Sequence, residues 1–167
     1  MTAPHDPYAP QLEFALEVRL RFRPLPKVQH MPSGGSRGMV ALDGGEFEGP
    51  LLAGKALPMS GGDFCLFRED GVLAADARYL LQEDDGSCFM LQTRGYIWGR
   101  TPEVMQQFER VAHGLTKEAP TFEQVYFRTV TTFEAPIGKH DWLAKHCFVG
   151  VGRRTELGNT IRYYKVL

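Results

Sequence analysis

Two long segments of alternating side chains, joined by a short polar turn, constrain the fold of this chain more than any other feature. Residues 72–82 and 88–98 flank the turn Glu83-Asp84-Asp85-Gly86-Ser87. A side-chain period of two is typical of β-strands, and a glycine late in a short loop is typical of a type I turn followed by a bulge. The pattern predicts an antiparallel hairpin in which Asp76 lies opposite Arg94 and Arg78 lies opposite Gln92.

Short strand patterns separated by Gly and Pro turns occupy most of the remaining chain. Residues 12–22 alternate clearly, and shorter strand patterns follow at 39–42, 46–48, 51–57, 64–67, 124–133, 148–152 and 160–167. One helix is expected, beginning at Thr101-Pro102-Glu103 and ending near Gly114. About ten short strands and one short helix predict an all-β fold, either an antiparallel barrel or a sandwich, and we favour the barrel.

The length and composition of the chain indicate one ordinary domain. With 167 residues we expect a flexible N-terminal arm at 1–11 and a single domain at 12–167. The 19 basic and 20 acidic residues nearly balance, which disfavours nucleic acid or an anionic membrane as a partner.

There is no apolar run of about 18 residues, the length that a membrane-spanning helix needs. Three widely spaced cysteines, Cys65, Cys88 and Cys147, indicate neither a disulfide framework nor a zinc cluster, so a cytoplasmic location is expected.

Three short motifs do not support a cofactor. The segment 49–56 nearly matches a phosphate-binding loop, but Ala56 replaces the hydroxyl residue that holds magnesium. The segment 34–38 fits a nucleophile-elbow pattern without the strand and helix that this turn requires. His140 and His146, with the neighbouring cysteine, lack a second ligand pair at zinc-site spacing. We therefore predict no metal and no cofactor.

The even-numbered face of the central hairpin gathers polar side chains that have two interpretations. Its polar members are Asp76, Arg78, Gln92, Arg94 and Tyr96. In the first interpretation the apolar odd-numbered face forms the core, and the charged residues make ordinary cross-strand pairs in water. In the second, the even-numbered face lines the interior of a barrel, where a low dielectric strengthens the interactions of charged groups.

A second set of candidate residues lies outside the hairpin. Tyr126 and Arg128 share one face of a strand, Trp142 follows an acidic residue, and Glu48 precedes a Gly-Pro kink. Each has an ordinary structural role available: core aromatics with a polar tip, or exposed charges. Each also fits the rim or the wall of a ligand-binding site.

These pieces, in their order along the chain, resemble one known family. The matching motifs are Gly44-Gly45-Glu46-Phe47-Glu48-Gly49-Pro50, Gly61-Gly62-Asp63, Asp76-Ala77-Arg78-Tyr79, Asp84-Asp85-Gly86, Arg94-Gly95, Tyr126-Phe127-Arg128-Thr129, Phe133-Glu134 and Trp142-Leu143. The chain is similar, from about residue 12 to 167, to the domain of unknown function 3237 family. The resemblance implies a small antiparallel barrel and brings no established common reaction. Phe64 stands where the usual family pattern has an aromatic residue such as tryptophan, and residues 139–141 depart from the pattern expected before Trp-Leu.

We expect a β-barrel that binds a small aromatic or acidic metabolite and acts on it by proton transfer, as a cofactor-independent lyase, isomerase or hydratase. Asp76, Arg94 and Tyr96 are the predicted catalytic residues, in which Arg94 sets the pKa of the carboxyl group. The predicted substrate-binding residues are Glu48, Arg78, Tyr126, Arg128 and Trp142.

The sequence leaves two other classes of function open. One is a non-catalytic carrier that resembles a lipocalin and uses the same interior. The other is a structural oligomerisation module in which the hairpin face contacts another subunit. A homo-oligomer is expected alongside the small-molecule ligand.

Overall fold

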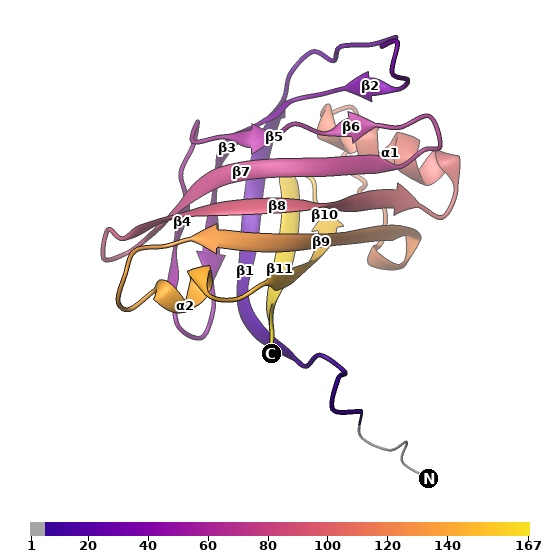
Figure 1. The fold of residues 1–167 in the computed structure, drawn as a ribbon. Helices are drawn as coiled ribbons and strands as arrows, with labels where there is room; N and C mark the ends of the chain where they lie inside the picture. The colour runs from indigo at the N-terminus through magenta and orange to yellow at the C-terminus, as the bar shows by residue number, and fades with distance from the viewer. Residues whose placement is uncertain (1–5) are drawn as a thin grey trace.

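A closed antiparallel β-barrel forms the body of the protein in the computed structural model, which describes residues 6–167 (Figure 1). The first half of the chain holds β1 (Leu12–Pro24), β2 (Ser36–Arg37), β3 (Val40–Glu48), β4 (Ala53–Ala56), β5 (Gly62–Asp63), β6 (Leu66–Phe67) and β7 (Leu73–Glu83). The second half holds β8 (Cys88–Gly99), α1 (Pro102–Ala112), a 3-10 turn (Phe122–Gln124), β9 (Val125–Glu134), α2 (Asp141–Ala144), β10 (Phe148–Arg154) and β11 (Gly158–Val166). The prediction of an antiparallel barrel is confirmed.

Closure of the sheet runs through eight strand positions. β1 pairs with both β3 and β11, and the ladder continues from β11 through β10, β9 and β8 to β7. The short β4 and β5 share the place between β3 and β7, while β2 and β6 extend the sheet beyond β7. Because the barrel closes, its main strands have no unpaired edge that would recruit another chain.

The central hairpin has the register that the sequence predicts. Asp76 lies opposite Arg94 and Arg78 lies opposite Gln92 in the β7–β8 ladder. Gly86 in the connecting turn has a φ of +90°, the left-handed conformation expected there. The predicted hairpin is therefore confirmed in both its pairing and its turn.

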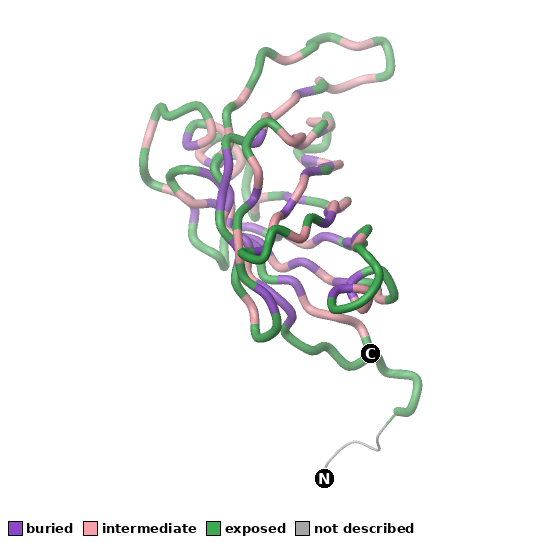
Figure 2. The backbone as a smooth tube through the Cα atoms, turned by 90° about the vertical axis from the view of Figure 1, so that its left-hand side faces the viewer, coloured by how far each residue is buried: buried purple, intermediate pink, exposed green. Residues whose placement is uncertain are grey.

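The odd-numbered residues of β7 face the core. Leu73, Tyr79 and Leu81 are 6%, 1% and 0% exposed, whereas the intervening even-numbered residues are half-buried or exposed. Figure 2 shows this alternation of buried and accessible positions along the strands. The first interpretation of the hairpin is confirmed, and the second, in which its charged face lines the barrel interior, is wrong. Apolar side chains already occupy the inward positions, so the charged residues point outward.

Two helices lie near opposite ends of the β7–β8 hairpin (Figure 1). α1 begins directly after Thr101, as predicted, and buries Val104, Phe108 and Val111 against the barrel. The short α2 near the β7–β8 turn and the 3-10 turn before β9 were not predicted, because single turns of helix carry no clear periodicity. No helix within residues 6–167 combines the length and the hydropathy that crossing a membrane requires.

Residues 1–5 of the predicted N-terminal arm lie outside the described residues.

Substitutions on the two faces of the wall test this orientation. Leu91→Ala removes a fully buried inward side chain of β8, so we expect it to lower the free energy of unfolding by about 2–5 kcal/mol. Val130→Ala, at a position on β9 that is 62% exposed, is the matched control and should change it by about 0.5 kcal/mol or less. Urea unfolding of both variants provides the measurement. Equal destabilisation by the two substitutions would contradict the assigned faces.

Candidate functional site

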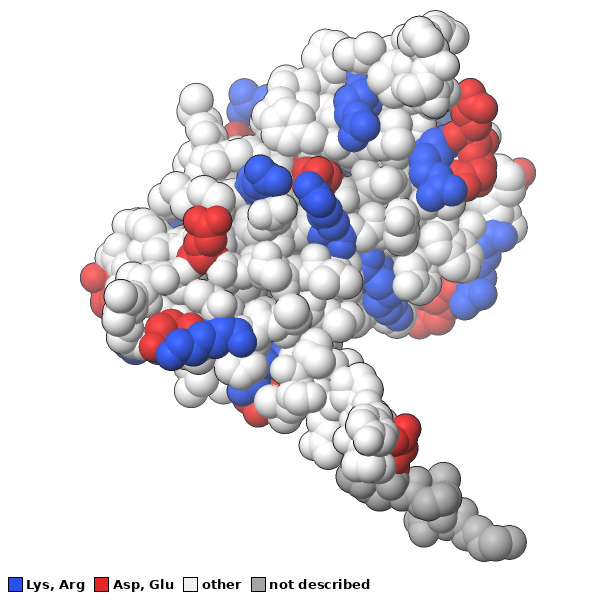
Figure 3. Space-filling view, in the orientation of Figure 1, with Lys and Arg blue, Asp and Glu red and all other residues white. Residues whose placement is uncertain are grey.

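Five of the eight predicted site residues converge on one groove in the outer wall of the barrel. The groove crosses β7, β8 and β9, encloses about 1220 Å³ including open solvent, and is lined by Asp76, Arg94, Tyr96, Tyr126 and Arg128, together with Arg37. Figure 3 faces this wall and shows several basic side chains distributed across it. The sequence thus identified residues that are neighbours in space, although on the outside of the barrel.

The groove is rich in guanidinium groups and aromatic rings, but it is open to water. Arg94 Nε donates to Asp76 Oδ1 at 3.2 Å, and the two side chains are 63% and 40% exposed. The Arg128 guanidinium lies 5.4 Å from the ring centre of Tyr126, which stacks on Trp98 at 5.1 Å. An exposed ion pair contributes about 0–1 kcal/mol, because water screens both charges. The groove therefore suits the binding of a planar anion better than acid–base chemistry.

The other three predicted residues do not join the groove. Arg78 is exposed on the same wall, opposite Gln92. Glu48 ends β3 and makes an ion pair with Arg19 at 3.2 Å. Trp142 lies on α2, 6.0 Å from the ring of Phe148.

A second, more enclosed space lies between α1 and the adjoining end of the barrel. Its empty volume is about 610 Å³. The centres of water-sized molecules fit into only about 50 Å³ of that space, so the cavity is a narrow slot. Most of its wall is apolar, formed by side chains such as Phe22, Leu25, Val40, Phe67, Leu73, Ile97 and Phe108. We call it the end cavity. Its polar members include Lys27, Asp63, Glu109, His113, Arg154 and Asn159.

Arg154 brings an unmatched positive charge to the end cavity. The residue is 8% exposed at the end of β10, and its Nη1 donates to Asn159 Oδ1 at 3.1 Å. Its guanidinium lies 5.2 Å from the ring centre of Phe108 on α1. Within residues 6–167, its Nε has no hydrogen-bond partner and no carboxylate forms an ion pair with it. Burial lowers the pKa of Arg154 to about 10, so the group still carries its charge at neutral pH.

Asp63 supplies a carboxyl group that titrates near neutral pH in the same cavity. It pairs with Ala77 across β5 and β7, so its side chain shares the inward face of the wall. Burial raises the pKa of Asp63 to about 6, and the nearby negative charge of Asp76 adds to the rise. The backbone N–H of Asp76, which donates to Asp63 Oδ1 at 2.8 Å, opposes it. A pKa close to ambient pH is what general acid–base catalysis requires.

Polar groups continue from Asp63 into the barrel interior. Burial raises the pKa of Tyr163 to about 12 and that of Tyr79 well above 10, and the charge of Asp63 contributes to both. Neither phenol has a hydrogen-bond partner within the described residues, whereas Thr93 and Thr131 bond to each other at 2.7 Å. The two phenols remain protonated at neutral pH and lie in the packed interior, 1% and 0% exposed.

Sequence reasoning assigned no role to Arg154 and noted Asp63 only as a family motif position. Asp63 follows Gly61 and Gly62 and ends a strand of only two residues. Such a short strand shows too little alternation to predict the direction of the Asp63 side chain. The burial of Arg154 depends on Phe108, a contact between distant segments that the local pattern does not contain.

The raised pKa of Asp63 predicts a change of stability with pH. The folded protein binds the proton more tightly than the unfolded chain, so stability falls as the pH rises from about 4 to about 6. A rise in pKa from 3.8 to about 6 corresponds to about 3 kcal/mol at most. Asp63→Asn keeps an acceptor oxygen at this position and removes the loss of stability that accompanies ionisation of the carboxyl group. We therefore expect the variant to gain stability over wild type between pH 4 and pH 7 in urea unfolding; a constant difference would contradict the raised pKa.

Comparisons with known proteins place the chain in a family. A relative in Rhodopseudomonas palustris strain TIE-1, named a UPF0311 protein, is 30% identical over 133 residues, covering 80% of this chain and 82% of the relative. The crystal structure of a β-barrel-like protein from Acinetobacter baumannii has a TM-score of 0.77 at 28% identity, with 98% and 99% of the two chains covered.

A more distant crystal structure, described as an enzyme from Penicillium herquei, has a TM-score of 0.65 at 19% identity and covers 99% and 100% of the chains. That likeness shows the fold alone. The family model described as "Protein of unknown function (DUF3237)" matches residues 10–166. The chain therefore belongs to the DUF3237 family, as its motifs predicted.

Proposed function

We propose that the protein binds a small molecule with an anionic group and an apolar body in the end cavity, and moves a proton on it without a cofactor. The observation that carries this proposal is the buried guanidinium of Arg154, which lines a mainly apolar cavity and has no carboxylate partner within residues 6–167. A carboxylate or an enolate oxygen on the ligand would complete the missing ion pair.

The energetics of burial support an anionic ligand. An unpaired charge costs several kcal/mol to bury, so a buried arginine with a purely structural role is normally paired. The cation–π contact with Phe108 and the single bond to Asn159 offset only part of that cost. Lys27, the lysine in the cavity wall, is already paired with Glu109 at 2.9 Å. Arg154 is therefore the cationic group that is available to a ligand.

Asp63 is the proposed proton-transfer group. In its ionised form it takes a proton from the bound ligand, and in its protonated form it returns that proton to another atom of the same ligand, so no further reactant is needed. Arg154, which lines the same cavity, stabilises the oxygen on which negative charge develops. By itself this proton transfer is the chemistry of an isomerase. In a lyase or a hydratase the same transfer would accompany the departure of a leaving group or the addition of a water molecule. The sequence predicted this role for Asp76, which lies in the outer groove and is 40% exposed to water.

Binding of a ligand requires α1 to move. The free space admits little more than a few water molecules, and Phe108, Glu109, Ala112 and His113 of this region form part of the cavity wall. The ion pair between Lys27 and Glu109 and the packing of Phe108 hold the helix closed. A carrier that uses the same cavity without chemistry is the alternative, and it returns its ligand unaltered.

A second candidate function is assembly through the outer groove. Tyr96 and Val130 are 53% and 62% exposed beside Arg94 and Arg128, an arrangement that a subunit interface commonly uses. Light scattering tests it. If the groove is an interface, wild type is oligomeric and Arg94→Glu lowers its mass; a monomeric wild type removes this candidate.

Thermal unfolding with small carboxylates tests the role of Arg154. Propionate and benzoate serve as probes, and at about five times its dissociation constant each should stabilise wild type by about 1 kcal/mol. Arg154→Met should abolish this protection. The variant should nevertheless unfold at the wild-type temperature or above, because it removes an unpaired buried charge while retaining most of the volume.

Arg128→Met is the matched control, since it removes a guanidinium from the outer groove and leaves the end cavity intact. It should retain the protection by both probes. Protection that is lost in Arg128→Met and kept in Arg154→Met would contradict the proposal and place the anion site in the outer groove. Asp63→Asn should still bind the probes, because its role is proton transfer.

A further inference from the structure

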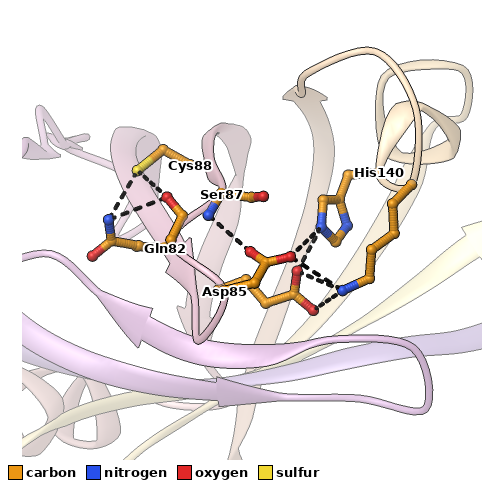
Figure 4. A network of polar contacts seen from close by, with 8 residues as sticks. Gln82, Asp85, Ser87, Cys88 and His140 are labelled. Carbon is orange, nitrogen blue, oxygen red and sulfur yellow. Dashed lines mark hydrogen bonds and ion pairs between the residues drawn. The ribbon is translucent and has the colours of Figure 1, made fainter.

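A mixed cluster of carboxylates and imidazole lies at the β7–β8 turn, where the turn meets the loop before α2 (Figure 4). Glu83 ends β7, Asp85 belongs to the turn, and His140 immediately precedes α2. One ligand atom from each residue lies within 4.8 Å of the others. None of these residues belongs to the end cavity or the outer groove.

His140 is buried and directs its Nε2 atom, which makes no hydrogen bond within the described residues, into this cluster. The residue is 3% exposed, and its Nε2 lies 2.5 Å from Glu83 Oε2 and 4.0 Å from Asp85 Oδ2. The close contact with Glu83 lacks hydrogen-bond geometry, so Nε2 has no hydrogen-bond partner within the described residues. Figure 4 shows the imidazole of His140 directed toward Asp85. A buried nitrogen in this position lacks the bond that would offset its desolvation.

A cationic group already occupies the space between the carboxylates. Lys139 Nζ lies 2.8 Å and 3.0 Å from the two oxygens of Glu83 and 3.4 Å from Asp85 Oδ2. The Lys139 side chain is 60% exposed, whereas that of Glu83 is 9% exposed. The lysine can therefore swing into water and leave its place beside Glu83 to another cation.

We propose that Glu83, Asp85 and His140 bind a divalent transition-metal ion such as Zn²⁺, with Lys139 as the group that the ion displaces. One imidazole nitrogen and two carboxylate oxygens form a donor set that zinc accepts at about 2.0–2.2 Å, leaving a fourth position for water. Those bond lengths place tetrahedral donors about 3–4 Å apart. The ion therefore separates His140 from Glu83 and draws in Asp85, which is free to adjust because it lies in an exposed turn.

The ion would tie the hairpin turn to the α2 segment. His140 packs against Phe89 with ring centres 5.8 Å apart, so its position is set by the core. Asp85 comes from an exposed turn and is the ligand with the most freedom to adjust. This site revises the sequence expectation of no metal, which considered only His140, His146 and the neighbouring cysteine.

Calorimetric titration with zinc chloride, on the full chain, tests the proposal through two substitutions of opposite effect. Lys139→Ala removes the competing ammonium group and should tighten zinc binding by about tenfold or more. Asp85→Asn removes one ligand and should weaken it by about tenfold or more. Both positions are exposed, so the fold should tolerate both changes. Cobalt bound at the same site should give the visible absorption of a tetrahedral nitrogen–oxygen centre.

Two matched controls separate this site from general surface charge. Asp84→Asn changes the neighbouring exposed carboxylate of the same turn, and Lys145→Ala changes a lysine that pairs with Asp141 at 2.7 Å on α2. Neither control should alter zinc affinity. The proposal is overturned if Lys139→Ala binds no zinc at millimolar concentration, if it binds no more tightly than wild type, or if Asp84→Asn weakens binding as much as Asp85→Asn.

Discussion

Closure of the sheet, with one face of every main strand directed inward, is the constraint on which the rest of the structure depends. The interior is filled by large side chains such as Phe47, Tyr79, Phe89 and Tyr163, each 2% exposed or less. The middle of the barrel is consequently a packed core, and the enclosed polar chemistry is displaced toward its ends. α1 covers one end beside Arg154 and Asp63, while α2 lies by the other beside His140 and Glu83.

The two ends of the barrel carry buried groups of opposite charge. At the α1 end the buried cation Arg154 has no ion-pair partner among residues 6–167, and burial raises the pKa of the Asp63 carboxyl group to about 6. At the α2 end two carboxylates and an imidazole surround one lysine whose side chain is 60% exposed. Each arrangement is costly for an isolated chain and becomes favourable when a ligand of the complementary charge binds. Stability and binding thus oppose one another at the same residues, as is common at functional sites.

Local patterns predicted the elements better than the site. The hairpin register followed from alternation and from Gly86, and α1 followed from Thr101 and Pro102, because these signals lie within a few residues. Alternation alone does not say which face is inward. Five predicted residues were neighbours because register fixes proximity, yet they lie outside the barrel. Arg154 and His140 become significant only through contacts with Phe108 and Glu83, which are far away in the sequence.

Arginine Nε–H resonances, followed by NMR during a titration with propionate, test the central claim that the end cavity is the ligand site. The account predicts that the Nε–H signal of Arg154, for which residues 6–167 supply no hydrogen-bond partner, shifts and becomes protected from exchange with water. The signals of Arg94 and Arg128 in the outer groove should stay in place. Shifts confined to the two groove arginines, with Arg154 unaffected, would contradict the account.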